Sequence, residues 1–256
     1  TVKNSPRRPA AILWDMDGTI VDTEPYWIAA EFEVVDLHGD SWSEEHAKAV
    51  VGFDLLDSGE YMRAHGGVRL SAPEIVELLL DRVVARLREN VPWRPGAREL
   101  LTAVRDAEIP SALVTMSWRR FADEVVACLP EKVFSATVVG DEVAEGKPHP
   151  EPYLLAAEKL GVNPRDCLAI EDSPTGARSA LAAGCWVLGV PNVVKIPENL
   201  GDEFLVGDTN DRDMVDRDMA ERDMADRDMG ARDTPVSRLR LIETLENLTL
   251  GDLRTW

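Results

Sequence analysis

Short, continuous apolar runs alternate with helix-like stretches along most of the chain. The apolar runs lie at 10–14, 111–114, 135–139, 167–170, 185–190 and 204–206. The stretches with helical character lie near 97–107, 119–128, 150–160 and 175–183. Unbroken apolar strands are typical of parallel sheets that helices cover on both faces, and strand–helix alternation joins such strands by right-handed crossovers. The pattern therefore predicts an α/β fold with a parallel sheet at its core.

The segment 25–91 interrupts this alternation. It contains long amphipathic stretches such as APEIVELLLDRVVARLREN and no clear strand. Pro25 suits the first turn of a helix, and the prolines and glycine that follow residue 91 favour a linker. We therefore predict a small all-helical domain at 25–91, inserted into a discontinuous core formed by 1–24 and 92–256.

A five-residue repeat occupies 211–235 and reads DRDMV DRDMA ERDMA DRDMG ARDTP. It holds nine acids and five arginines, which gives a net charge of 5 − 9 = −4. A period of five matches neither the 3.6-residue period of a helix nor the two-residue period of a strand, so its methionines form no apolar stripe. We interpret 208–235 as a flexible, acidic insertion, and an acidic docking element for a partner is the alternative.

Charge and composition exclude several classes of function. The 256 residues carry 28 basic and 47 acidic side chains, a net charge of −19, which disfavours nucleic-acid and anionic-membrane partners. No apolar run approaches the ~20 residues of a membrane-spanning helix. Cys128, Cys167 and Cys185 show neither metal-ligand nor disulfide spacing, which favours a reducing compartment. We expect a cytoplasmic protein, present as a monomer or a weak homodimer.

Polar side chains follow four of the predicted strands, at the point where each strand ends. In chain order they are Asp15 and Asp17, with Gly18 directly after them, then Thr115, then Lys147, and finally Glu171 and Asp172. Taken singly, each has an ordinary interpretation as a turn, a helix cap or a surface lysine. Ligands bind beyond the carboxyl ends of parallel strands, so the joint arrangement predicts a site at one sheet edge. Four acids with one base would repel one another there unless a divalent cation were bound.

These residue types in this order favour phosphoryl transfer. Asp15, at a strand tip, is placed to attack phosphorus as a nucleophile, and Asp17 to protonate the leaving alkoxide and later activate water. Gly18 permits the tight turn of this phosphate-binding loop. Thr115 and Lys147 offer a donor and a positive charge to the phosphoryl oxygens.

The same acids also predict a magnesium site, because Mg²⁺ prefers oxygen ligands and retained waters. We expect Asp15 and Asp172 as direct ligands, together with the backbone carbonyl of Asp17. Glu171 is expected to ligate directly or through water.

Four motifs together resemble the haloacid-dehalogenase-like phosphohydrolase superfamily. They are DMDGT, LVT, GKPHPEPY and AIEDSPTG, and the resemblance spans nearly the whole chain except the repeat. It implies a Rossmann-like core, a helical cap inserted after the first motif, Mg²⁺ and an aspartyl-phosphate intermediate. The stretch IVDTEPYW is similar to the branch that contains sugar-phosphate phosphatases and beta-phosphoglucomutase.

Two departures from that branch narrow the expected function. Mutases carry a histidine four residues after the threonine that here is Thr23, and this chain has Trp27 there. Mutases and several sugar phosphatases carry a cap-loop arginine near the position that here is Asp54. An arginine there would bind a second phosphate, whereas the aspartate of this chain would repel it. We therefore expect hydrolysis of a small phosphomonoester, a sugar or polyol phosphate. A phosphomutase and a non-catalytic phospho-ligand or interaction protein that uses the repeat remain the alternatives.

The cap is expected to close over the site and to set substrate choice. The candidates for contact with the leaving group are Trp27, Asp54 and Arg63, with Glu60 and Tyr61 beside them.

Overall fold

The computed structural model describes residues 8–51, 53–204 and 237–254. Within these ranges six strands form one sheet in the order β3-β2-β1-β4-β5-β6, and every neighbouring pair is parallel. The strands are β1 Ala11–Trp14, β2 Ser111–Val114, β3 Ala136–Val138, β4 Cys167–Glu171, β5 Trp186–Gly189 and β6 Leu239–Leu241. The predicted α/β parallel-sheet fold is confirmed.

Helices cover both faces of the sheet because the strands are apolar on both sides. Ile12 and Trp14 of β1 belong to a cluster with α5, while Ala11 and Leu13 belong to the opposite cluster with α7 and α8. These helices are α5 Ala97–Asp106, α6 Arg119–Ala127, α7 Glu151–Leu160 and α8 Pro174–Ala182. Their bounds agree with the four helical stretches that the sequence predicts. Short 3-10 helices lie at Gly140–Glu142, Pro164–Asp166, Glu198–Phe204 and Asp252–Arg254.

The sixth strand lies elsewhere than the sequence predicts. Phe204 ends a 3-10 helix rather than starting a strand, and 205–206 lie outside the described residues, as does the repeat at 208–235. The strand instead follows the repeat, where Leu241 pairs with Gly189 at the sheet edge. Its sequence LRL is three residues long and half-exposed, so it shows no continuous apolar run.

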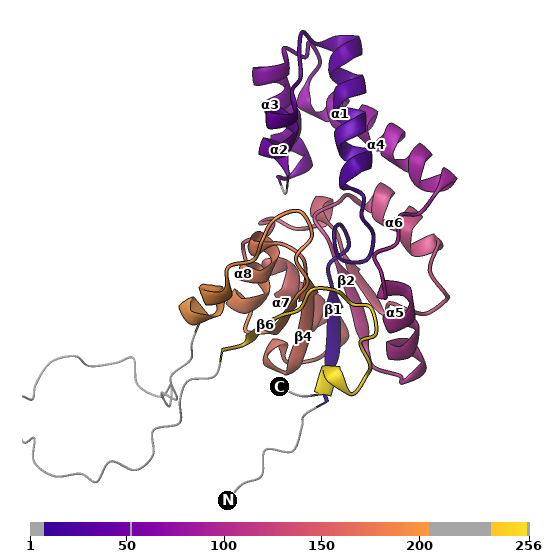
Figure 1. Ribbon diagram of the computed structural model, residues 1–256, viewed down its shortest axis with the longest axis vertical. Coiled ribbons are helices and arrows are strands. Elements are labelled where there is room, and N and C mark those ends of the chain that lie inside the picture. Colours follow the sequence, from indigo (N-terminus) through magenta and orange to yellow (C-terminus); the bar gives the residue numbers. More distant parts are fainter. Residues whose placement is uncertain (1–7, 52, 205–236, 255–256) are drawn as a thin grey trace, which may run out of the picture.

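Four helices lie between β1 and α5 along the chain. They are α1 Glu24–His38, α2 Glu44–Val50, α3 Leu55–Gly66 and α4 Ala72–Glu89, and the described part of 25–91 contains no strand. A capping box starts α4, where Ser71 N donates to Glu74 Oε2 over 2.8 Å. Figure 1 shows α1, α2 and α3 standing beyond one end of the sheet. The division into a core and a cap domain at residue 25 and residue 91 stays a prediction.

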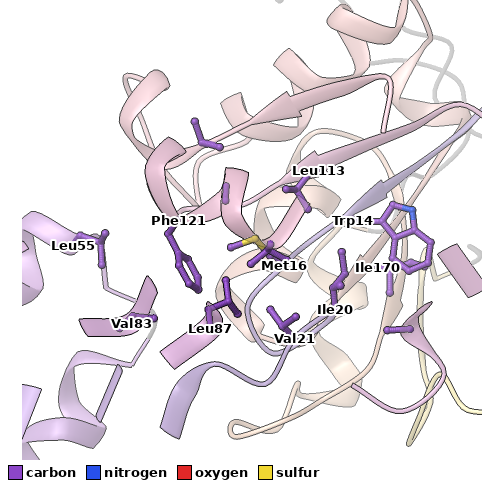
Figure 2. Packing of buried hydrophobic residues seen from close by; sticks show 14 of the residues in the cluster. Trp14, Met16, Ile20, Val21, Leu55, Val83, Leu87, Leu113, Phe121 and Ile170 are labelled. Carbon is purple, nitrogen blue, oxygen red and sulfur yellow. The ribbon is translucent and has the colours of Figure 1, made fainter. Parts of the chain in front are cut away.

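The helical segment is tied to the core by apolar packing. Val83 and Leu87 of α4 belong to the same buried cluster as Met16, Leu113 and Phe121 (Figure 2). The loop after β1 therefore lies between the sheet and α4, and its conformation depends on both. None of the helices in the described residues is long and apolar enough to cross a membrane.

Candidate active site

The loop after β1 begins the site. Asp15 N donates to Ile170 O over 3.0 Å, so the ladder between β1 and β4 continues up to the aspartate. Gly18 has φ 85° and its N–H donates to Val21 O over 2.7 Å. A Cβ at Gly18 would lie 2.0 Å from Asp172 Oδ2. Glycine is thus required twice, by the left-handed backbone and by the close approach of the loop that follows β4.

Lys147 joins the ends of three strands. Its Nζ lies 2.7 Å from Asp15 Oδ1, 2.6 Å from Glu171 Oε1 and 2.9 Å from the carbonyl oxygen of Val114. The lysine side chain is only 6% exposed. A buried ammonium that bridges two carboxylates fixes their separation and partly neutralises them.

Hydroxyl groups surround Asp17. Thr23 Oγ1 donates to Asp17 Oδ1 over 2.5 Å, and Ser117 Oγ and Thr115 Oγ1 donate to Asp17 Oδ2 over 2.7 and 3.2 Å. Asp15 receives a similar bond, because Thr19 Oγ1 donates to its Oδ2 over 2.8 Å. The two aspartates of the first motif are therefore held in defined orientations.

The acids also form a group that suits a hard cation. Asp15, Glu171 and Asp172 each offer one carboxylate oxygen, and these atoms lie within 4.8 Å of one another. An all-oxygen donor set fits Mg²⁺. Glu171 is the most heavily engaged of the three, because its Oε1 accepts from Lys147 and Tyr153 and its Oε2 from Asp172 N and Ser173 Oγ. Those bonds suit Glu171 to ligation through water.

The electrostatics show an excess of buried negative charge. Burial raises the pKa of Asp15 to about 7, with Glu171 adding to the effect and Lys147 opposing it. Burial likewise raises the pKa of Asp172, and Asp15 adds to it. Burial alone would lower the pKa of Lys147, but Asp15 and Glu171 together raise it. A divalent cation would relieve this repulsion, which is an independent reason to expect one.

Sequence reasoning assigned no role to Tyr153 or Ser117. Tyr153 is fully buried and its hydroxyl donates to Glu171 Oε1 over 2.7 Å. It stands in the third motif, six residues after Lys147, in the first turn of α7, and that spacing could have indicated it. Ser117 lies two residues after Thr115. From the sequence alone it would be interpreted as an ordinary hydroxyl in a loop.

A cavity of about 170 Å³ opens between the site and the four helices. The predicted core residues that line it are Asp15, Asp17, Gly18, Thr115, Lys147 and Asp172. Glu171 belongs to the site through its contacts with Lys147. Trp27 also lines the cavity, with its ring edge-on to Phe121 at a centroid distance of 5.4 Å.

The other cap candidates lie elsewhere. Asp54 is the N-cap of α3, where its Oδ1 accepts from Leu56 N over 2.8 Å. Arg63 pairs with Glu60 at 2.8 Å on an exposed face of α3. Tyr61 stacks on His65 at a centroid distance of 4.1 Å. None of these four candidates is among the described residues that line the cavity, and their contact with a leaving group stays a prediction. The face of α3 that reaches it carries Leu55 and Ser58.

We expect Glu31→Gln to make the stability of the protein less dependent on pH. Burial raises the pKa of Glu31 to about 8, from an ordinary value of 4.5. Between these two values the unfolded chain has lost a proton that the folded chain retains, so the contribution of Glu31 to stability falls as pH rises from about 4.5 to 8. The variant should gain at least about 1 kcal/mol over the wild type between pH 5 and pH 8.

Thermal unfolding of both proteins across that range measures the difference. Glu33→Gln is the matched control, because Glu33 lies on the same helix but is exposed and pairs with Arg82. Parallel stability curves for Glu31→Gln and wild type would contradict the prediction.

Comparison with known proteins identifies the family. A family described as "Haloacid dehalogenase-like hydrolase" matches residues 12–190. The chain belongs to this family. The predicted resemblance is thus confirmed, and the matched range begins in β1 and ends just after β5.

Relatives of this haloacid dehalogenase-like hydrolase include named sugar phosphatases. It is 32% identical to "Phosphorylated carbohydrates phosphatase" of Thermotoga maritima, over 68% of this chain and 81% of that protein. It is also 32% identical to "Hexitol phosphatase A" of Escherichia coli, over 72% and 83% of the two chains. Among solved structures, CbbY from Rhodobacter sphaeroides in complex with phosphate is 28% identical, with a TM-score of 0.67 over 72% of this chain and 87% of that one.

Proposed function

We propose that this protein is a Mg²⁺-dependent phosphatase that hydrolyses a small phosphomonoester, a sugar or polyol phosphate, through an aspartyl-phosphate on Asp15. The observation that carries the proposal is the position of Asp15 at the end of β1, 2.7 Å from Lys147 and beside the hydroxyl-bound Asp17. The names of the relatives support the same substrate class.

In the first step, a carboxylate oxygen of Asp15 forms a bond to phosphorus while the bond to the ester oxygen breaks. Asp17 gives its proton to that leaving oxygen, so the alcohol departs neutral. Lys147 and the hydroxyl of Thr115 stabilise the charge on the phosphoryl oxygens. In the second step Asp17 takes a proton from water as the water oxygen bonds to phosphorus and the bond between Asp15 and phosphorus breaks. Inorganic phosphate is released and the Asp15 carboxylate is restored.

Asp15 and Asp172 are the residues that would hold Mg²⁺, with Glu171 behind them. When bound, the cation supplies positive charge to the phosphoryl oxygens and to the crowded carboxylates. The chain itself orients Asp15 through Lys147 and Thr19, and Asp17 through Thr23 and Ser117.

Removal of divalent cations should abolish phosphate release. With EDTA we expect a loss of at least about 10²-fold, because Lys147 alone cannot neutralise both the phosphoryl group and the acids. Added Mg²⁺ should restore the rate, and phosphate release is measured with p-nitrophenyl phosphate. An unchanged rate after exhaustive chelation would count against the metal part of the proposal.

Trp27 supports a phosphatase over a mutase. Its indole occupies the position where mutases carry histidine, and it packs against Phe121 at the cavity wall. An indole has no basic nitrogen for proton transfer. Conversion between phosphosugar isomers without net phosphate release would instead establish the mutase.

Several further properties stay predictions. We place the protein in the cytoplasm as a monomer or weak homodimer, without nucleic-acid or membrane partners. Cys128, Cys167 and Cys185 are free thiols, which is compatible with a reducing compartment.

A further inference from the structure

The cap side of the cavity carries two carboxyl groups on one helix. Glu24 and Glu31 both lie on α1, seven residues and hence about two turns apart, and both line the cavity. Glu31 is 5% exposed. The part of the lining that α1 contributes is therefore acidic, and Lys147 is the only lysine or arginine among the described lining residues.

The surroundings of Glu31 leave part of its hydrogen-bonding capacity unused. Trp42 Nε1 donates to Glu31 Oε2 over 3.2 Å, and within the described ranges we find no second donor for this carboxyl. A carboxylate can accept about four hydrogen bonds, and burying one without partners is costly. Glu31 therefore has acceptor sites available beside a space that a ligand can enter.

The walls around these carboxyls are apolar. Trp27, Val50 and Leu79 line the cavity together with Glu31. Such a wall with few polar groups is the usual construction of a specificity pocket, in which the polar groups set orientation. Burial raises the pKa of Glu31 to about 8, with Trp42 opposing and Glu24 adding to it, so the carboxyl is a purely accepting anion above that pH and carries an O–H donor as well below it.

We propose that Glu31 determines which leaving group is accepted: its carboxyl binds hydroxyl groups of a polyhydroxylated leaving group and excludes one that carries a second anion. This inference rests on the proposed phosphatase function. A site built to hydrogen-bond a substrate hydroxyl strongly rejects an analogue that lacks it, because the buried polar group is then left unpaired. A second phosphate or carboxylate would face Glu24 and Glu31 with no arginine or lysine to receive it.

The test compares esters matched in length. Erythritol 4-phosphate and n-butyl phosphate differ in their hydroxyl groups, and p-nitrophenyl phosphate reports the chemical step without a polyol. The wild type should favour the erythritol ester over the butyl ester by about 10²-fold in kcat/KM. At pH 9, where Glu31 is ionised, Glu31→Gln should reduce that ratio about tenfold, since Trp42 then donates to the amide oxygen and the cavity receives a donor in place of an acceptor. Hydrolysis of p-nitrophenyl phosphate should change by less than about threefold.

Glu33→Gln, on the exposed side of the same helix, should keep the wild-type ratio. Glu31→Met removes the acceptor altogether and should lower the ratio further. It serves as the second variant if Glu31→Gln fails to fold or changes the ratio too little.

An unchanged ratio in folded Glu31→Gln and Glu31→Met would overturn the inference. So would a wild type that prefers fructose 1,6-bisphosphate, phosphoglycolate or phosphoethanolamine over the polyol ester. Those results leave p-nitrophenyl phosphate hydrolysis intact, whereas its absence in the wild type with Mg²⁺ would overturn the proposed function instead.

Discussion

Asp15→Asn is expected to lower phosphate release by at least about 10⁴-fold while the protein stays folded. The side-chain amide matches the carboxylate in shape but is a poor nucleophile, so the bond to phosphorus cannot form at a useful rate. Lys147 can still donate to the amide oxygen, and the hydroxyl of Thr19, which donates to the other oxygen of Asp15, can instead accept from the amide NH2. The measurement is phosphate release from p-nitrophenyl phosphate with saturating Mg²⁺.

Stability should not fall in this variant. Burial and Glu171 raise the pKa of Asp15 to about 7, which means that its ionised form is disfavoured in the folded protein. A neutral side chain removes that penalty, so the midpoint of thermal unfolding without Mg²⁺ should be unchanged or higher at pH 8. Asp36→Asn, on the exposed face of α1, controls for the substitution and should retain full activity. A folded Asp15→Asn protein that keeps more than about 1% of the wild-type rate would refute the nucleophile assignment.

The core of the site was predictable because its residues occupy strand ends. The carboxyl ends of parallel strands meet at one edge, so chain order alone places Asp15, Thr115 and Asp172 together. The polar character of each residue contrasts with the apolar run before it, which gives a local signal. Lys147 follows a loop of several residues after β3, and there the family resemblance contributed as much as the position.

The cap residues were harder to predict because helix phase decides which side chains face the cavity. Asp54 immediately precedes α3, and a short acidic side chain at that position bonds to the helix backbone instead of reaching a ligand. Arg63 is eight residues beyond Leu55, yet it pairs with Glu60 away from the cavity. Glu31 lies in a stretch whose pattern shows only that a helix forms. Its burial depends on Trp42, which reaches it from the loop between α1 and α2.

The edge strand β6 shows a second limit. Three residues with an exposed arginine in the middle carry too little apolar character to be separated from a loop. Its pairing with β5 arises from tertiary contact after the repeat, which no local pattern encodes.

Lys147→Met is expected to reduce both activity and stability, each by a large amount. Its ammonium contacts Asp15 and Glu171 at 2.7 and 2.6 Å, and both carboxylates are almost fully buried. Removal of one partner from a buried ionic group leaves uncompensated charge and costs about 3–5 kcal/mol. Loss of the positive charge at the phosphoryl group should lower kcat by at least about 10²-fold even where the variant is folded.

The pH dependence separates this electrostatic cause from a simple packing defect. Without Lys147 the pKa of Asp15 should rise further above its present value of about 7, because the lysine is what now lowers it. A carboxyl whose pKa is raised by folding destabilises the folded state as pH increases past its unfolded value, and it has no effect where it is protonated in both states. The stability deficit of Lys147→Met should therefore be small near pH 4 and largest above pH 7. A packing defect would be constant with pH.

Denaturant unfolding in EDTA at pH 4.5 and pH 8 measures this deficit. Lys48→Met is the control, since Lys48 is exposed and its ion pair with Glu44 spans 3.9 Å, so its removal should change stability by less than about 0.5 kcal/mol. A deficit that is equal at the two pH values, or larger at pH 4.5, would show that Lys147 acts through packing. The site would then need another source of compensation for its carboxylates. A deficit confined to high pH would instead identify Lys147 as the group that allows Asp15 to be ionised, and therefore nucleophilic, in a buried position.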